Sequence, residues 1–327
     1  MGYLMLLVVR VVLCVYMFMM FHFACLSSHL CHSQDSSALL HFKTHFIFNP
    51  SLFDYDYHYD YEYEYECPHV YPKMSTWENG TDCCSWMGVT CHSVSGHVIG
   101  LDLSCGALVG NIHPNSTLFH LTHLQTLNLA FNFFNHSPFS SQFSKLVSLT
   151  HLNLSNCGFQ GPISSSFYNL TYLTSLNLME NQLNGSIPSS LLNLQRLTHL
   201  DLSRNKLSGR IPNVFDRITN LQTLSLSYNN FQGKLPSSLF TLTRLSQLDC
   251  SDNQIEGSLP NELLSNNIIG WSKFSGKFPQ LKLLDLSSNK LEGKVPKWIH
   301  DIHSLYHLKL SHNMFTSIGH QFPCYSI

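Results

Sequence analysis

Three aspartates recur at one position of a repeated block and are the first candidates for chemistry. Asp201, Asp249 and Asp285 would form a row, and paired carboxylates can cleave glycosidic bonds. General acid catalysis, however, needs an enclosed site that raises the pKa of one carboxyl, and a flat row offers none. Histidines such as His199 and His307 also recur with the repeat, which favours neutral surface positions over a catalytic cluster. We therefore predict that the protein is not an enzyme and needs no cofactor.

The charge of the chain argues against nucleic acid as a partner. The 327 residues include 18 Lys plus Arg and 20 Asp plus Glu, which gives a net charge of -2. Nucleic-acid-binding proteins carry a basic patch or stripe. The nearly equal numbers of acidic and basic residues in this chain create no positive electrostatic potential that would attract phosphates.

The N-terminus indicates the cellular compartment. Residues 4–21 are apolar apart from Arg10, and small or polar residues follow from Ala24 onward. This pattern predicts a secretory signal peptide over residues 1–26, with cleavage between about Ala24 and Ser33. An uncleaved membrane anchor is the alternative, because the apolar stretch is nearly long enough to span a bilayer.

The cysteines fit that compartment. Cys83, Cys84 and Cys91 lie close together, and disulfides would staple this short loop in an oxidising environment. Zinc is not expected, because a secreted chain oxidises its thiols and the sequence has no Cys-x-x-Cys pair, so we predict no metal site. Cys250 takes a leucine position and is expected to be a buried free thiol. Cys105 and Cys324 have no obvious mates.

Internal repeats dominate the rest of the chain. About nine blocks occupy residues 98–327, mostly with a period of 24, and an asparagine slot recurs in them, as at Asn205 and Asn229. One block alone cannot offset the entropy of ordering its backbone, so the blocks must stack their leucine layers into a right-handed solenoid with a short parallel strand in each coil. The opening positions are Val98, Leu124, Leu149, Leu173, Leu197, Leu221, Leu245, Leu281 and Leu305.

Two sets of motifs carry a family resemblance. The element LxGxIP, as in Leu207–Pro212, is similar to the plant-specific class of leucine-rich repeat. Upstream, Asp35–Lys43 and Trp77–Cys91 resemble the N-terminal cap of plant receptor-like proteins. The resemblance implies an α/β solenoid, a right-handed superhelix of plant-type repeats, with a disulfide-stapled N-terminal cap over residues 27–97.

The cap has to cover the first leucine layer. A helix that begins after Asp35 as its N-cap is expected to do so with Leu39, Leu40, Phe42 and Phe46. The resemblance implies that Cys84 pairs with Cys91 and Cys83 with Cys31; because Cys67 is left over, a pairing of Cys83 with Cys67 is the rival. The alternation of acids and tyrosines over residues 54–66 is interpreted as a solvated loop.

Residues that alternate with the buried leucines of each strand are expected to face solvent on the concave side. They would form a rigid polar grid suited to an extended peptide, protein or oligosaccharide ligand. The candidate ligand-binding residues are Ser175, Asn177, His199, Asp201, Ser203, Thr223, Ser225, Gln247, Asp249, His307 and Lys309.

Six acceptor sequons fit a glycosylated, secreted protein. A glycan on Asn153 would stand on the concave face and block part of it, so ligand contact is expected elsewhere along that face. The sequons are at Asn79, Asn115, Asn135, Asn153, Asn169 and Asn184.

The repeats become irregular at 260–280, which suggests a partly deleted repeat that divides the solenoid, and no C-terminal cap is recognisable before Ile327. By resemblance, the chain is expected to be the N-terminal portion of a receptor-like protein at the extracellular face of the plasma membrane. It would recognise a ligand in pathogen perception and signal through a receptor-like kinase partner. A secreted protein similar to polygalacturonase inhibitors, or a non-functional truncated product, is the alternative.

Overall fold

The computed structural model describes residues 17, 30–53, 67, 70–134, 137–260 and 278–317. The signal peptide, apart from Met17, lies outside these residues, as do the 54–66 segment, the sequon at Asn135 and Cys324.

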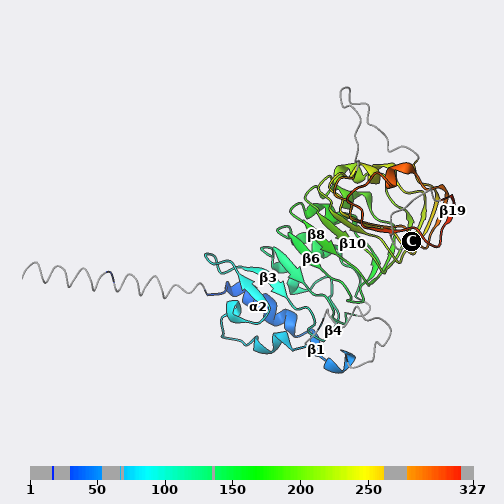
Figure 1. Ribbon diagram of the computed structural model, residues 1–327. Helices are drawn as coiled ribbons and strands as arrows, with labels where there is room; N and C mark the ends of the chain where they lie inside the picture. The colour runs from blue at the N-terminus through cyan, green and yellow to red at the C-terminus, as the bar shows by residue number, and fades with distance from the viewer. Residues whose placement is uncertain are drawn as a thin grey trace, which may run out of the picture.

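The repeats stack into a curved solenoid that runs from the cap to β19 (Figure 1). One sheet of ten strands follows its concave side, and neighbouring strands are parallel except for β2, which is antiparallel to β3. Its strands in chain order are β2 (Val89–Cys91), β3 (Val98–Asp102), β5 (Thr126–Asn128), β6 (His151–Asn153), β8 (Ser175–Asn177), β10 (His199–Asp201), β12 (Thr223–Ser225), β14 (Gln247–Asp249), β16 (Leu283–Asp285) and β18 (His307–Lys309).

A second, parallel sheet of seven strands runs beside the first, built from the LxGxIP elements. The sequence analysis predicted one strand per coil, so this sheet is an addition. Its strands are β7 (Gln160–Pro162), β9 (Gln182–Gly185), β11 (Lys206–Arg210), β13 (Asn230–Gly233), β15 (Gln254–Ser258), β17 (Lys290–Lys294) and β19 (Met314–Ser317).

Short 3-10 helices, rather than α-helices, make the outer connections of the coils. They turn the chain within three to five residues, which keeps each coil short. They are η5 (Thr117–His120), η6 (Ser141–Lys145), η7 (Ser165–Asn169), η8 (Ser189–Asn193), η9 (Phe215–Arg217), η10 (Ser237–Thr241) and η11 (Lys297–Ile299).

The leucine layers form one continuous core. All nine opening positions predicted from the sequence are buried, from Val98 at 0% to Leu305 at 4% exposed. Within a coil, Leu200 of β10, Leu202 just after that strand and Leu207 of β11 are also buried. The predicted period is therefore confirmed as the spacing of the core.

Buried asparagines connect each coil to the one before it. The Nδ2 group of Asn229 donates to the carbonyls of Leu202, Leu226 and Ser227, and its Oδ1 accepts from the backbone N–H of Leu207. Cys157 fills the same slot in its coil and donates through Sγ to Leu129 O. These side chains satisfy backbone groups at a bend where no ladder partner is available.

The N-terminal cap covers the first coil with α2 (Ser33–Lys43), whose Leu39 and Phe42 are buried. The helix begins earlier than predicted: its N-cap is His32, and Asp35 lies in the first turn. Asp35 is not the cap because its carboxylate accepts the backbone N–H of Val98, at 2.9 Å. Shorter cap elements are β1 (Phe46–Phe48), which pairs with β4 (Leu108–Gly110), η1 (Pro50–Phe53), η3 (Lys73–Thr76) and η4 (Cys83–Ser85).

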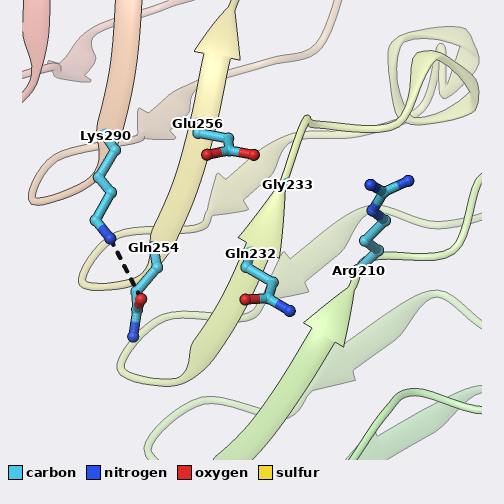
Figure 2. A pocket seen from close by; sticks show the side chains of 6 residues that line it. All are labelled: Arg210, Gln232, Gly233, Gln254, Glu256 and Lys290. Carbon is cyan, nitrogen blue, oxygen red and sulfur yellow. Dashed lines mark hydrogen bonds between the residues drawn. The ribbon is translucent and has the colours of Figure 1, made fainter.

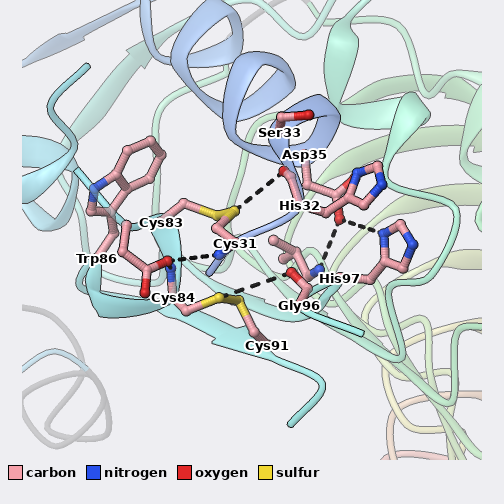
Figure 3. Close-up of a disulfide and its surroundings, with 12 residues drawn as sticks. Cys31, His32, Ser33, Asp35, Cys83, Cys84, Trp86, Cys91, Gly96 and His97 are labelled. Carbon is pink, nitrogen blue, oxygen red and sulfur yellow. Dashed lines mark hydrogen bonds and ion pairs between the residues drawn. A yellow bond between two sulfur atoms is a disulfide. The ribbon is translucent and has the colours of Figure 1, made fainter. Parts of the chain in front are cut away.

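Three disulfides hold the cap. Cys31 pairs with Cys83, and Cys84 with Cys91, as the family resemblance implied (Figure 3). Cys67 pairs with Cys105, so the rival pairing of Cys67 with Cys83 is wrong, and Cys105 does have a mate. In the part of the chain described, Cys157 and Cys250 are free and buried, which confirms the prediction for Cys250.

The irregular stretch at 260–280 does not divide the solenoid. Leu248 of β14 pairs with Leu284 of β16 in the regular register, and β15 pairs with β17. Phe278 is buried at the position that Leu242 holds one coil earlier. The distance along the chain from Pro260 to Phe278 is twelve residues longer than the matching stretch of that coil. The strands on either side of this stretch therefore pair directly, so the interpretation that it divides the solenoid is wrong; its origin as a partly deleted repeat stays a prediction.

Candidate functional site

The concave sheet aligns the predicted contact residues in two rows. Strand pairing places His199 beside Ser175 and Thr223, with Gln247 next along that row. The same pairing places Asp201 between Asn177 and Ser225, followed by Asp249, Asp285 and Lys309. Because neighbouring strands are about 4.8 Å apart, the side chains form a grid with that spacing. Leu283, half-buried, interrupts the first row before His307.

The three aspartates repeat one local motif. Oδ1 of Asp201 accepts hydrogen bonds from the backbone N–H and the hydroxyl of Ser203, at 2.9 and 2.6 Å. Asp249 with Ser251, and Asp285 with Ser287, make the same pair of bonds. Ser203 is only 5% exposed and its hydroxyl is bonded to Asp201, so it orients that carboxylate; its role as a ligand contact stays a prediction.

Electrostatics distinguish the members of this row. Burial raises the pKa of Asp201, despite the hydrogen bonds from Ser203 that favour its ionised form. Lys309 lies 3.2 Å from Asp285, and this hydrogen bond and charge pairing raise the pKa of the lysine. Asp249 lies between them and is half-exposed. This row therefore carries hydrogen-bond acceptors along most of its length and ends at Lys309, whose charge is paired with that of Asp285.

A third row, which the sequence analysis missed, borders the aspartates. Arg204 lies in the turn after β10, and Tyr228 lies in the turn after β12. Both residues have a left-handed backbone with φ 52°. The Arg204 guanidinium lies over the Tyr228 ring, 4.6 Å from its centroid. The charge of Asp252 raises the pKa of the Tyr228 hydroxyl. The alternation of strand residues could not reveal this row, because its members follow the strand, but their equal spacing of 24 residues could.

The second sheet carries a shallow polar hollow, also missed from the sequence (Figure 2). Arg210, Gln232 and Gln254 come from successive strands, and Lys290 donates a hydrogen bond to Gln254 at 3.3 Å. Gly233, with φ 77°, forms part of its floor, and an added Cβ there would lie 3.2 Å from Cγ of Arg210.

Family models match both parts of this architecture. A model described as leucine rich repeat N-terminal domain matches residues 32–54 and 68–92, and models described as leucine rich repeat match 148–170, 172–194, 196–218, 220–242, 244–266 and 263–315. The chain is a leucine-rich-repeat protein. The resemblance stated from its cap and LxGxIP elements is thereby confirmed.

Curated relatives of this leucine-rich-repeat protein are plant receptor-like proteins. Receptor-like protein 6 of Arabidopsis thaliana is 45% identical over 141 residues, which are 42% of this chain and 14% of the relative. Receptor-like protein Cf-9 of Solanum pimpinellifolium is 40% identical over 117 residues, covering 36% of this chain and 13% of the relative. The chain thus matches only about a seventh of the length of these relatives.

Solved structures share the solenoid. The ectodomain of the Arabidopsis receptor kinase GASSHO1/SCHENGEN3, in complex with Casparian strip integrity factor 2, aligns with a TM-score of 0.63 and 29% identity over 74% of this chain and 30% of that one. A plant ice-binding protein aligns with a TM-score of 0.67 and 28% identity over 88% and 81%. Because these neighbours have different ligands, the shared fold alone does not select a ligand for the leucine-rich-repeat protein.

The described sequons of the leucine-rich-repeat protein fall into two groups. Asn79, Asn115, Asn169 and Asn184 are exposed. Asn153 is half-buried on β6, in the same row as Asn177, and its Oδ1 accepts the backbone N–H of Ser155. Its place on the concave sheet is the predicted one; glycosylation at these sites stays a prediction.

Proposed function

We propose that this leucine-rich-repeat protein is the ligand-recognising N-terminal part of a plant cell-surface receptor-like protein, and that it acts by binding rather than catalysis. The observation that carries the proposal is the polar grid over β8–β18, which a rigid parallel sheet holds in register. The similarity of the chain to plant receptor-like proteins supports the assignment. In the ranges that the structure covers, no helix combines the length and apolar character needed to cross a bilayer.

The grid favours an extended peptide as ligand. Six strands from β8 to β18 span about 24 Å across the sheet, the length of about seven residues of extended chain. Asp201 and Asp249 would accept hydrogen bonds along this path, and the half-exposed Asp249 would pair with a basic side chain. A glycan on Asn153 would limit the ligand to the strands that follow β6. The similarity of the chain to a solved plant peptide hormone receptor, RGFR1 in complex with RGF2, supports this class of ligand.

We propose further that the protein works in pathogen perception and defence, at the extracellular face of the plasma membrane. A receptor-like kinase would be its signalling partner. This part of the proposal rests on the resemblance to plant receptor-like proteins.

A displayed library of random dodecapeptides, panned on the full chain secreted from plant cells, tests the ligand class. We expect the selected peptides to be rich in Lys and Arg. Their affinity should fall about tenfold with Asp249→Asn, because the substitution removes a partly desolvated charge partner. Asp216→Asn is the matched control, since it makes the same change at an exposed position of η9, on the outer connection.

Equal binding of the peptides to both variants would refute the concave site. Selection of no peptide, together with tight binding and inhibition of a microbial polygalacturonase, would favour the secreted inhibitor. Co-purification of a receptor-like kinase from plant cells, with and without the selected peptide, tests the signalling partner separately.

A further inference from the structure

Two histidines and an aspartate meet where the cap joins the first coil (Figure 3). His32 directly precedes α2, Asp35 lies in its first turn, and His97 directly precedes β3. The His32 and His97 rings are stacked with centroids 4.1 Å apart, and His123 stacks on the other side of His97 at 4.0 Å. The group therefore joins elements that are far apart in the sequence.

The three side chains offer ligand atoms at close range. A ring nitrogen of each histidine and a carboxylate oxygen of Asp35 all lie within 4.8 Å of one another. Nδ1 of His97 is 3.1 Å from Oδ2 of Asp35. In a tetrahedral site with metal–ligand bonds of 2.0–2.1 Å, two ligand atoms are about 3.3 Å apart. The present spacing of His97 and Asp35 is close to that value.

One atom of this group has no partner to explain its position. Nδ1 of His32 is buried and makes no hydrogen bond to any residue that the structure describes. Buried polar atoms are nearly always satisfied, so an orphan beside two further ligand groups indicates a missing ligand. The ring of His32 is stacked on that of His97, and the backbone N–H of His32 is bonded to Gly96 O at 3.0 Å, so the backbone of the residue is anchored at this junction.

We propose that His32, Asp35 and His97 bind a divalent transition-metal ion of the zinc type. Two imidazole nitrogens and one carboxylate suit Zn²⁺ and Cu²⁺, whereas Ca²⁺ and Mg²⁺ require sites built from oxygen ligands. Water would complete the coordination, since the side chain of His97 is 24% exposed and gives access from solvent.

The surroundings support the ligands in the way that metal sites require. Val98 N–H donates to Oδ2 of Asp35 and orients the carboxylate, which is only 8% exposed. The metal would link the helix of the cap to the strand that opens the first coil, next to two disulfides. Because the cysteines of the cap are disulfide-bonded, their sulfur atoms are not available as thiolate ligands. The sequence analysis, which predicted no metal site, considered cysteine ligands and missed this group.

Zinc titration of the tag-free secreted chain by isothermal calorimetry at pH 7 tests the proposal. We expect one site of high affinity, at least tenfold weaker in His32→Gln and in His97→Gln. His41→Gln is the matched control, because His41 is an exposed histidine on the same helix, and its ring is tilted against that of His45 with centroids 5.0 Å apart. Zinc should raise the Tm of the wild type and the control, and the affinity should fall as the pH drops and protons compete for the imidazoles.

Cobalt substitution distinguishes this site from adventitious binding. Bound Co²⁺ should give visible absorption bands of low coordination number without a thiolate charge-transfer band. The proposal is overturned if Zn²⁺ does not bind, if His32→Gln binds it as tightly as wild type, or if His41→Gln weakens binding equally. A thiolate band, which would reveal cysteine ligands, would also overturn it. Circular dichroism of each variant separates loss of the site from loss of folding.

Discussion

Replacing Asn229 with alanine removes four hydrogen bonds from the middle of the solenoid. The backbone N–H of Leu207 would be left buried without an acceptor, since Leu207 is 0% exposed. An unsatisfied buried donor costs about 1–3 kcal/mol, and the weakened carbonyl bonds add to it, so we expect a loss of about 3 kcal/mol. Stacking energy passes between neighbours, so the loss should be local.

Native-state hydrogen exchange measures this loss coil by coil. The amides of β10 to β13 should exchange about a hundredfold faster in Asn229→Ala, whereas those of β3 and β5 should change little. Asn230→Ala is the control, because Asn230 is the next residue and is exposed. Asn229→Cys should recover part of the loss, since Cys157 fills the same slot naturally. A change below about 0.5 kcal/mol, or one equal to that of Asn230→Ala, would refute the role given to the asparagines.

Three further predictions concern the cap, the concave row and the irregular stretch at 260–280. Cys67→Ser should destabilise the chain by about 4 kcal/mol and Cys84→Ser by about 2 kcal/mol, because the two disulfides close loops of 38 and 7 residues. Thermal unfolding measures both losses. A larger loss for Cys84→Ser than for Cys67→Ser would contradict the dependence on loop length. Burial raises the folded pKa of Asp201 above its unfolded value, so its contribution to stability is present at low pH and is lost as the pH rises through the folded pKa. Asp201→Asn should therefore raise the Tm at pH 7 and flatten its pH dependence, and a lower Tm at pH 7 would show that the charge is stabilising. Deleting residues 263–274 should leave the hydrogen-exchange protection of β14 and β16 unchanged, because these strands pair directly. Loss of that protection would show that the deleted segment supports the sheet.

The core could be predicted because its pattern is simple. Every coil repeats the leucines and the asparagine at the same spacing, and a buried position tolerates few alternatives. The concave grid followed from alternation along strands such as β10. Alternation does not show, however, that the hydroxyl of Ser203 is bonded to Asp201.

The features that sequence reasoning missed depend on contacts between distant segments. Cys105 lies in the first coil, and its pairing with Cys67 depends on how the cap returns across that coil. The strands of the second sheet are only three to five residues long, which is too short for alternation to identify them as strands, although the LxGxIP element recurs. Asp35 has a favourable residue type for an N-cap, but Val98 N–H competes for its carboxylate.

The asparagine contacts give the solenoid a direction. Asn205 bonds the backbone of Leu178 and Leu183 in the preceding coil, and Asn229 repeats this with Leu202 and Leu207. The backbone groups of each coil are thus satisfied by the coil that follows it, while the first coil is also joined to the cap by the Cys67–Cys105 disulfide. Under mechanical load the described part of the molecule should detach coil by coil from its C-terminal side. A force applied from that side would therefore unfold one coil at a time, and the cap would unfold last.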